Sequence, residues 1–446
     1  MNTARGSLRL FALASIAATV ALTVTETPGQ VTQSWATILD DGVSTDSGKF
    51  VQLDPVGNAI VGDTLPPRTS FLTLRLAKID PSGTVIWSRL FASDRPGGTL
   101  SIRGLAVDGA GDILAVCSDY PATTTVKVSS TGTELWRATF DTPSADWPVG
   151  IEVDAAGRSF VGGTTELQEP TRRLVNAFIV SYDADGSLLW QDEYGSGNAQ
   201  ETIYDIARDP VGGAVYLAGR LRAQSNAESA LLLRYDPDGR LRWAKQYQGK
   251  PYLGYAQKVA VGPDGSVALA GWLSSGDVDI QVIKVDASNG RKLWSAVYEA
   301  ATYDQLSDLA IDGSGNIFVS GHMETMPPIG VNVGACLIRY APNGVLSWLV
   351  VDDRIDRLPG ALAVDASGSS YVTATHVVPF GSSFKQHWLT TRYDATGQLV
   401  WTAEYDGNPG GPASGFADDL ALTPAGDLIV VGNVNYDMHV VSYRQP

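Results

Sequence analysis

Three aspartates occupy the same position in separate copies of a repeated sequence. Asp205, Asp308 and Asp419 each stand at the start of the first strand-like segment of their copy. Copies arranged around one axis would direct these carboxylates toward a common centre. Hard cations such as calcium prefer oxygen ligands, so the pattern predicts a site for a divalent cation or a cationic ligand. The alternative is that each carboxylate accepts hydrogen bonds from the backbone of its own loop.

Histidines are the next candidates for chemistry, and the chain has only four. His322 and His376 each end the second strand-like segment of adjacent copies. Because histidine titrates near neutral pH, these two, close to Asp308, are the candidate general bases of an enzyme. Their positions differ by one residue when the copies are aligned, so a matched pair does not follow from the sequence.

Aromatic residues occur in the segments that vary most between copies. Exposed aromatic rings stack on sugars or anchor a protein partner. The alternative is local packing within long loops. The candidates for binding are Trp147, Trp272 and Tyr255, and the same segments hold Phe380, Phe384 and Tyr436.

Other features limit the possible functions. The sequence lacks the H-E-x-x-H, G-x-S-x-G and phosphate-loop motifs and paired C-x-x-C motifs. The formal charge of −16 and the lack of a basic run argue against nucleic-acid binding and favour a soluble monomer. Cys117 and Cys336 lie in apolar runs of separate copies, which predicts buried free thiols.

The elements that position these residues come from a repeat of about 52 residues. Gaps of 49 to 54 residues separate eight tryptophans, and a glycine precedes each of the last seven by four residues. Each copy holds four short β-rich segments separated by turns that contain aspartate and glycine. Repeats of this size indicate a closed or stacked repeat architecture. The tryptophans are Trp35, Trp87, Trp136, Trp190, Trp243, Trp294, Trp348 and Trp401.

Four strands per repeat predict an all-β fold, an eight-bladed β-propeller. The last copy has three strands, and the segment around Trp35 supplies the fourth, which closes the ring. Seven blades is the alternative. The connections from the second to the third strand and from the fourth strand to the next copy vary, so they form a variable face, while the other face carries short uniform turns.

The N-terminus resembles an export signal. Arg5 and Arg9 precede an apolar run over residues 10–24. We therefore predict a signal peptide over residues 1–27 and one propeller domain over residues 28–446, without a membrane span in the mature protein. The protein is expected in the periplasm or outside the cell.

Segments of the repeat resemble known propeller families. Residues 176–190 and 309–321 resemble the SBBP family of secreted β-propeller repeats, which implies the fold and no common reaction. Residues 285–294 resemble the tryptophan-docking repeat of pyrroloquinoline-quinone propellers. Those enzymes carry adjacent cysteines at their cofactor, which this chain lacks, so no quinone cofactor is expected. The same repeat occurs in a propeller lipoprotein that scaffolds outer-membrane protein assembly, although the lipid-anchor cysteine is missing here.

Two functions fit these observations. The first is a secreted, non-catalytic binding or scaffold protein whose variable face engages a glycan or an extracellular protein. The second is a propeller enzyme, such as a polysaccharide lyase, glycosidase or lactonase, that uses the three aspartates with a divalent metal such as calcium. The lack of catalytic motifs favours binding.

Overall fold

The computed structural model describes most of the chain beyond its first 30 residues. The described residues are 16–20, 31–40, 48–65, 72–168, 173–197, 199–248, 253–274, 278–298, 303–325, 332–352, 359–381, 383–411 and 413–445. Within them the chain forms strands and no helix. Apart from residues 16–20, the predicted export signal lies outside the described residues.

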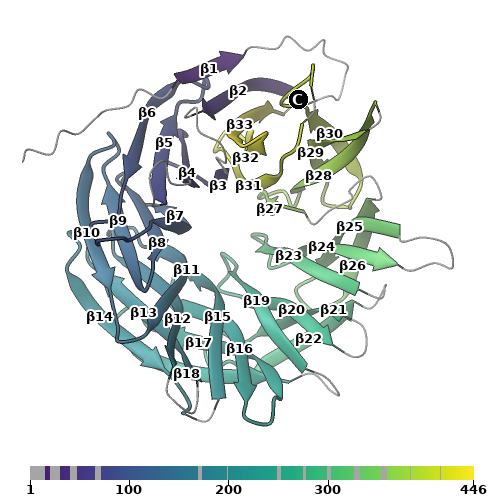
Figure 1. The fold of residues 1–446 in the computed structure, drawn as a ribbon. Helices are drawn as coiled ribbons and strands as arrows, with labels where there is room; N and C mark the ends of the chain where they lie inside the picture. Colours follow the sequence, from purple (N-terminus) through teal and green to yellow (C-terminus); the bar gives the residue numbers. More distant parts are fainter. Residues whose placement is uncertain are drawn as a thin grey trace, which may run out of the picture.

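The strands form eight blades around a central channel (Figure 1). In each blade strand A lies at the channel, strands B and C follow outward, and strand D lies at the rim. The first four blades, each from A to D, are β3 (Gly48–Leu53), β4 (Ala59–Leu65), β5 (Thr73–Ile79) and β6 (Val85–Phe91); β7 (Ser101–Val107), β8 (Ile113–Asp119), β9 (Ala122–Val128) and β10 (Glu134–Phe140); β11 (Ala145–Val153), β12 (Ser159–Gln168), β13 (Arg173–Tyr182) and β14 (Leu188–Tyr194); and β15 (Ala199–Arg208), β16 (Val215–Ala223), β17 (Glu228–Tyr235) and β18 (Leu241–Tyr247).

The other four blades follow the same order. Blades 5 to 8 are β19 (Leu253–Val261), β20 (Val267–Ser274), β21 (Val278–Val285) and β22 (Lys292–Tyr298); β23 (Tyr303–Ile311), β24 (Ile317–Thr325), β25 (Asn332–Tyr340) and β26 (Leu346–Asp352); β27 (Ala361–Val364), β28 (Ser370–Phe380), β29 (Ser383–Tyr393) and β30 (Leu399–Tyr405); and β31 (Ala417–Leu422), β32 (Leu428–Val434), β33 (Asp437–Arg444) and β2 (Thr32–Asp40). The prediction of eight blades is therefore confirmed, and the alternative of seven is not.

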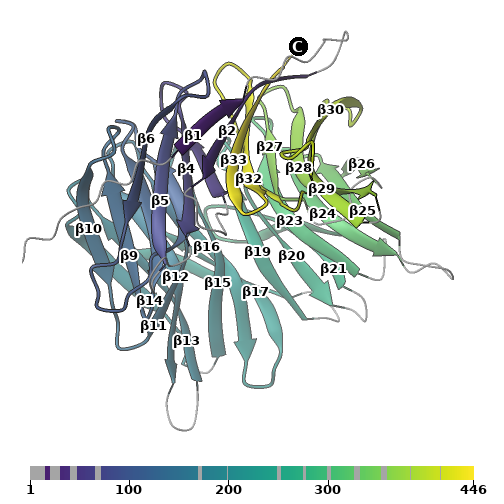
Figure 2. The same ribbon diagram turned by 45° about the horizontal axis from the view of Figure 1, so that its top comes forward.

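Blade 8 joins the two ends of the described chain. The strand β2 pairs antiparallel with β33, from Thr32 opposite Arg444 to Leu39 opposite Met438, and Figure 2 shows purple β2 beside yellow β33. This pairing confirms the predicted closure, which leaves no gap in the ring. A short strand, β1 (Ile16–Val20), pairs with the outer edge of β2. It falls within the predicted signal peptide, so cleavage there would leave β2 as the outer strand of its blade.

The core consists of a layer of apolar side chains between each pair of neighbouring blades. Strands B and C are buried along most of their length, as in β8, where all seven residues are buried. Cys117 and Cys336 lie in these layers as free, buried thiols, as predicted. Burial raises the pKa of the Cys336 thiol to about 12, so this cysteine stays unreactive at neutral pH.

Seven of the eight repeated tryptophans dock on the next blade in the same way. Each indole Nε1 donates a hydrogen bond of 2.9–3.2 Å to a backbone carbonyl in the strand C–D turn of the following blade. Each indole also covers the turn glycine, as Trp136 covers Gly186, where an added Cβ would lie 2.6 Å from the ring. The invariant spacing of glycine and tryptophan therefore holds the blades at one distance.

The eighth tryptophan, Trp401, differs from the other seven. Its indole is buried, yet within the described residues its Nε1 has no hydrogen-bond partner. Blade 8 has no strand C–D turn, because β33 ends at Arg444 and its strand D, β2, comes from the N-terminal part of the chain. Val31, four residues before Trp35, packs in the same apolar cluster as Trp401.

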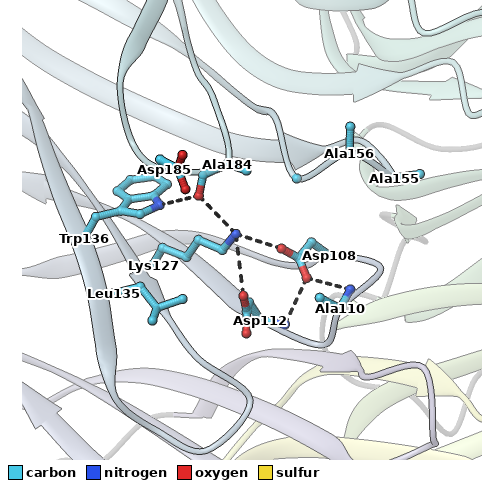
Figure 3. A pocket seen from close by; sticks show the side chains of 11 residues that line it. Asp108, Ala110, Asp112, Lys127, Leu135, Trp136, Ala155, Ala156, Ala184 and Asp185 are labelled. Carbon is cyan, nitrogen blue, oxygen red and sulfur yellow. Dashed lines mark hydrogen bonds and ion pairs between the residues drawn. The ribbon is translucent and has the colours of Figure 1, made fainter.

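Basic side chains reinforce the uniform face. In blade 2 the Lys127 Nζ lies 2.9 Å from Asp108 Oδ2 and 3.7 Å from Asp112 Oδ2, and it donates to the Ala184 carbonyl that also accepts from Trp136 (Figure 3). These residues line a pocket of about 490 Å³ between blades 2 and 3. Because its polar groups satisfy one another, we interpret this pocket as a structural joint.

Candidate functional site

A β-bulge precedes the aligned position in seven of the eight A strands. The register of each pair shifts by one residue at this point, as between Ile203 and Asp205 in β15 and between Ala417 and Asp419 in β31. A bulge leaves one extra residue unpaired and re-aims the neighbouring side chain. This local feature positions the three predicted aspartates at the inner wall of the ring.

The structure shows that these aspartates connect neighbouring blades. Asp308 and Asp419 each accept a bond of 2.9 Å from the next amide of their own strand. Each of the three also accepts a hydrogen bond from an A strand of the following blade. These bonds run from Val259 N to Asp205 Oδ2 (2.8 Å), from Leu362 N to Asp308 Oδ2 (3.1 Å) and from Val51 N to Asp419 Oδ2 (2.9 Å).

Charge couples the aspartates across the channel. The Lys258 Nζ lies 3.4 Å from Asp308 Oδ1, and Asp308 most of all, together with Asp205 and Asp419, raises the pKa of this lysine. Burial raises the pKa of Asp205 to about 6, against the opposing effects of Lys258 and the Val259 amide. Burial likewise raises the pKa of Asp419 to about 7. The three carboxylates therefore share one electrostatic environment, as the alignment indicated.

A fourth carboxyl group belongs to this environment, and the sequence analysis missed it. Glu152 on β11 lies two residues beyond the aligned position of its blade. Burial, with a further effect from Asp205, raises its pKa to about 8. The alignment considered only the first position of each A strand, although the side chain two residues later lies on the same face of a strand.

The predicted cation site lacks a ready set of ligands. In the part of the chain that the structure describes, no three histidine, cysteine, aspartate or glutamate side chains lie close enough to hold one metal ion. The Oδ2 atom of each aspartate already accepts an amide hydrogen. A cation there would have to share these carboxylates with the amides of the following blades.

The structure brings together two of the predicted aromatic residues. Tyr255 on β19 and Trp272 on β20 are cross-strand partners, with ring centroids 5.5 Å apart. The ring of Tyr204 on β15 lies 5.3 Å from that of Tyr255, tilted by 42°. The sequence placed Trp272 in a loop, but it lies within a strand and is half-buried. Tyr204 and Tyr255 pack between blades 4 and 5, and Trp272 packs against the apolar cluster of blades 5 and 6, so much of the surface of these rings is already used.

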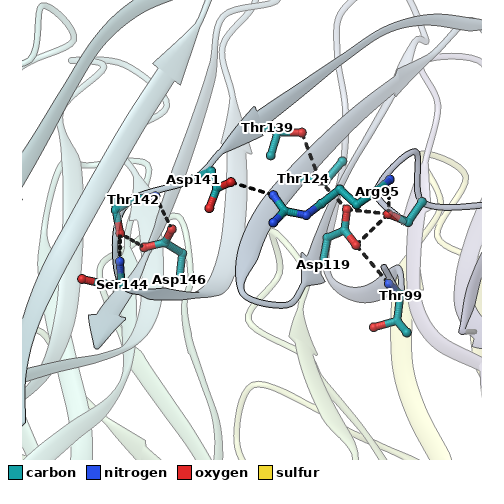
Figure 4. A network of polar contacts seen from close by, with 10 residues as sticks. Arg95, Thr99, Asp119, Thr124, Thr139, Asp141, Thr142, Ser144 and Asp146 are labelled. Carbon is teal, nitrogen blue, oxygen red and sulfur yellow. Dashed lines mark hydrogen bonds and ion pairs between the residues drawn. The ribbon is translucent and has the colours of Figure 1, made fainter. Parts of the chain in front are cut away.

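Trp147 is a more exposed ring. It lies in strand β11, whereas the sequence analysis expected a loop at this position. The side chain is 39% exposed, and the centroid of its ring lies 5.4 Å from that of Tyr120. A polar network fixes the surrounding loops (Figure 4). Within it Asp119 accepts bonds from Ser93 Oγ and Thr99 N, and Arg95 Nη1 lies 2.8 Å from Asp141 Oδ2.

The predicted histidines do not pair with each other. His322 lies on β24 and His376 on β28. The cross-strand partner of His376 is His387 on β29. Glu404 Oε1 lies 2.5 Å from His387 Nδ1 and 3.5 Å from His376 Nδ1. His387 received no role in the sequence analysis, and only the direct pairing of β28 with β29 reveals this arrangement.

A further group of exposed aromatic side chains lies where blades 7 and 8 meet at the variable face. Its members come from the adjoining ends of β28 and β29, the segment before β31, and the β32–β33 turn. We call this group the blade 7–8 patch. It comprises Phe380 (37% exposed), Phe384 (69%), Phe416 (39%) and Tyr436 (63%). The sequence analysis singled out three of these residues and missed Phe416.

A hydrogen-bonded strap, residues 413–416, holds the patch in place. The amide of Gln386 donates to the Ala413 carbonyl, and the Gln386 Oε1 accepts from Ser414 Oγ and Gly415 N. On the other side, Phe416 N donates to Asn433 Oδ1, and Asn433 N donates back to the Phe416 carbonyl. The strap thus ties strand C of blade 7 to strand B of blade 8.

Comparisons with known proteins agree with the fold. A family described as outer membrane protein assembly factor BamB matches residues 122–355. The match agrees with the resemblance of residues 285–294 to the tryptophan-docking repeat. No curated protein sequence matches the chain. Among the residues that the structure describes, no helix has the length and apolar character needed to span a membrane.

Several solved structures resemble the chain at low identity. The quinohemoprotein alcohol dehydrogenase of Comamonas testosteroni aligns with a TM-score of 0.57 and 12% identity, over 94% of this chain and 78% of that one. The WD40 domain of SCAP from fission yeast aligns with a TM-score of 0.47 and 11% identity, over 96% and 98%. Catalytically inactive virginiamycin B lyase from Staphylococcus aureus aligns with a TM-score of 0.43 and 12% identity, over 76% of this chain and 94% of that one. At these identities the likeness concerns the fold alone.

Proposed function

The chain belongs to the propeller family described as outer membrane protein assembly factor BamB, whose match spans more than half of its 446 residues, and on this premise we propose that it is an exported, non-catalytic scaffold. Its variable face binds a protein partner in the cell envelope. The family description supports the envelope location, together with the export signal predicted over residues 1–27. Residues resembling SBBP repeats fit the same location, because those repeats occur in secreted proteins.

One observation carries this proposal. The three aspartates that looked like a reaction centre each use an oxygen to accept an amide of the following blade. Their role in this arrangement is to join blades, because a buried amide left without its acceptor costs about 1–3 kcal/mol. Exposed aromatic side chains also lie on the variable face, such as Phe384 and Tyr436, and aromatic residues dominate binding energy at protein interfaces.

Site-specific photo-cross-linking in the native cell envelope tests the proposal. A photoreactive phenylalanine analogue would replace Gln224 or Tyr436 on the variable face, and Val56 or Val211 on the uniform face as matched controls; all four side chains are exposed. We expect the variable-face positions to give an adduct with the same envelope protein, identified by mass spectrometry. Adducts from the uniform face alone, or from neither face, would refute the proposal.

A second function has one observation in its favour. The raised pKa values of Asp205, Asp419 and Glu152 leave carboxyl groups that exchange protons near neutral pH, as general acids do. A propeller enzyme acting on polysaccharides, glycosides or lactones would use them, with or without a divalent cation such as calcium. This function predicts that EDTA lowers the melting temperature and calcium restores it. It also predicts loss of turnover in the Asp308→Asn/Asp419→Asn double variant, and equal activity would exclude it.

A further inference from the structure

Hydrogen bonds tie the backbone of the blade 7–8 patch to its neighbouring strands in the absence of any partner. Five hydrogen bonds between the strap and its two neighbouring strands were described above, and two more join Ser414 to Asn435, one through the Asn435 Oδ1 and one through the Asn435 amide. A pre-ordered surface loses little conformational entropy on binding, which leaves more of the contact energy available for affinity. The patch therefore has the physical character of a docking surface and not of a loose loop.

The backbone of Tyr436, one of the four residues of the patch, adopts a strained conformation. Tyr436 has φ 78°, and Asn435 before it has φ 50°. A bulky side chain rarely adopts this left-handed region, and such residues cluster at functional sites. Glycine would satisfy the turn without strain, yet the chain places a tyrosine there that is 63% exposed. The turn thus holds an aromatic ring outward at a cost in stability.

The polar groups around the patch favour a peptide over a glycan. Sugar recognition needs side-chain amides and hydroxyl groups that are available for hydrogen bonds. Here the carbonyl oxygens of Gln386, Asn433 and Asn435 already accept bonds from the strap. The rings remain as the main contact surface, and apolar anchors of a protein segment fill such surfaces.

The charge of the residues around the patch further limits the chemistry of its partner. The segments that build the patch, residues 377–387, 404–418 and 432–439, contain four carboxylates, Glu404, Asp406, Asp418 and Asp437, and one basic residue, Lys385. Lys385 is buried: its Nζ lies 3.0 Å from Asp406 Oδ2 and 4.4 Å from the centre of the Phe380 ring. Lys385 neutralises Asp406, and burial raises the pKa of Asp418 to about 7, so these two add little exposed charge. Glu404 and Asp437 leave the charge around the rings negative, and a partner of positive charge complements it.

We infer that the blade 7–8 patch docks a protein segment that combines apolar side chains with lysine or arginine. This inference rests on the proposed function, because it assigns the partner's chemistry and the place on the variable face where it binds. Apolar side chains contact the four rings, and the basic groups approach the surrounding carboxylates. The first contribution sets affinity, and the second adds a dependence on ionic strength.

A selection of peptides tests the inference on the mature full-length protein. A phage-displayed library of random dodecapeptides would be selected on the wild type and depleted on the Phe384→Ser/Tyr436→Ser variant. Both side chains are exposed, so the variant is expected to fold, and the Val56→Ser/Val211→Ser variant on the uniform face is its matched control. Circular dichroism and the melting temperature of each variant verify the fold.

We expect the selected peptides to combine aromatic or aliphatic residues with lysine or arginine. Synthetic versions should bind the Phe384→Ser/Tyr436→Ser variant at least tenfold more weakly than the control variant, and raising the salt from 50 to 300 mM should weaken binding severalfold. Absence of enriched peptides, enrichment of acidic peptides, or equal binding to both variants would overturn the inference. Patch-dependent binding of a soluble polysaccharide in place of peptides would also overturn it.

The two proposals fail in different ways. Photo-cross-links from Gln224 that persist in the Phe384→Ser/Tyr436→Ser variant, without any selected basic peptide, would leave the scaffold function standing and remove the patch as its docking surface. Loss of cross-links from every variable-face position would remove the proposed function itself.

Discussion

The uniform face and the variable face of the ring are built on opposite plans. On the uniform face, seven tryptophans repeat one hydrogen bond to a turn carbonyl and one contact with a glycine. On the variable face the contacts differ at each joint between blades, from the Asp119 network of Figure 4 to the strap at blades 7 and 8. Repetition thus serves stability, while sequence freedom on the other face allows binding.

The largest expected effect comes from filling a docked glycine. Gly186 has φ +85° and an added Cβ would lie 2.6 Å from the Trp136 ring, whereas Gly265 has φ +76° and nothing within 4 Å. Alanine at Gly265 should cost about 1 kcal/mol of unfolding free energy through the backbone alone. Alanine at Gly186 should cost about 3 kcal/mol, because overpacking adds to that strain. Urea unfolding measures both, and equal losses would show that the indole contact does not matter.

The eighth tryptophan provides the next test of the uniform face. Trp35 and Trp401 are equally buried, but only Trp35 donates a hydrogen bond, to the Pro81 carbonyl. Replacement by phenylalanine removes the same part of the ring from each site. We expect Trp35→Phe to lose about 1 kcal/mol more unfolding free energy than Trp401→Phe. A larger loss at Trp401 in denaturant titrations would mean that its N–H finds a partner in solution.

The channel aspartates make stability depend on pH. The folded-state pKa of Asp419, about 7, exceeds the value near 3.9 of an unfolded chain, so the folded state binds more protons between these pH values. Its contribution to stability is therefore present below pH 4 and declines as the pH rises toward 7. Because the carboxyl group is partly exposed, we expect the Asp419→Asn variant to flatten the decline between pH 5 and 7.5 by about 1 kcal/mol. An unchanged slope in unfolding experiments at the two pH values would contradict this assignment.

The smallest effect concerns the strained turn of the variable face. Tyr436→Gly should raise the unfolding free energy by about 0.5–1 kcal/mol, since glycine adopts positive φ freely. Phe384→Gly is the matched control, because it removes an exposed ring without any such strain and should give no gain. A destabilised Tyr436→Gly variant in calorimetry would mean that the ring packs on its neighbours more than its exposure indicates.

The sequence predicted those parts of the molecule that depend on periodicity. The constant spacing between a glycine and a tryptophan, as between Gly186 and Trp190, predicted the turns. The strand-like segment around Trp35 predicted the closure of blade 8. The repeat also aligned Asp205, Asp308 and Asp419 at one position, because the bulge recurs at the same place in seven of the eight A strands, including the three that carry these aspartates.

What these side chains contact could not be predicted in the same way. The acceptor role of Asp205 toward Val259 depends on how closely the A strands of two neighbouring blades approach each other. The pairing of His376 with His387 depends on the register of the long β28–β29 hairpin. Phe416 carried no signal, because it precedes β31 in a glycine-rich segment and becomes part of a surface only through the strap.

The pairing of β2 with β33 also imposes an order on assembly. Strand β2 is synthesised before every other strand of the eight blades, and its partner β33 is the last described strand to be synthesised. Contacts between such distant segments form late, since the whole intervening chain must first be brought together. Until then the other blades form an open arc with exposed edges at both ends, a state prone to wrong pairing. Pairing of β33 with β2 therefore completes the ring, and a chain that lacks this pairing keeps exposed strand edges that distinguish it from the folded protein.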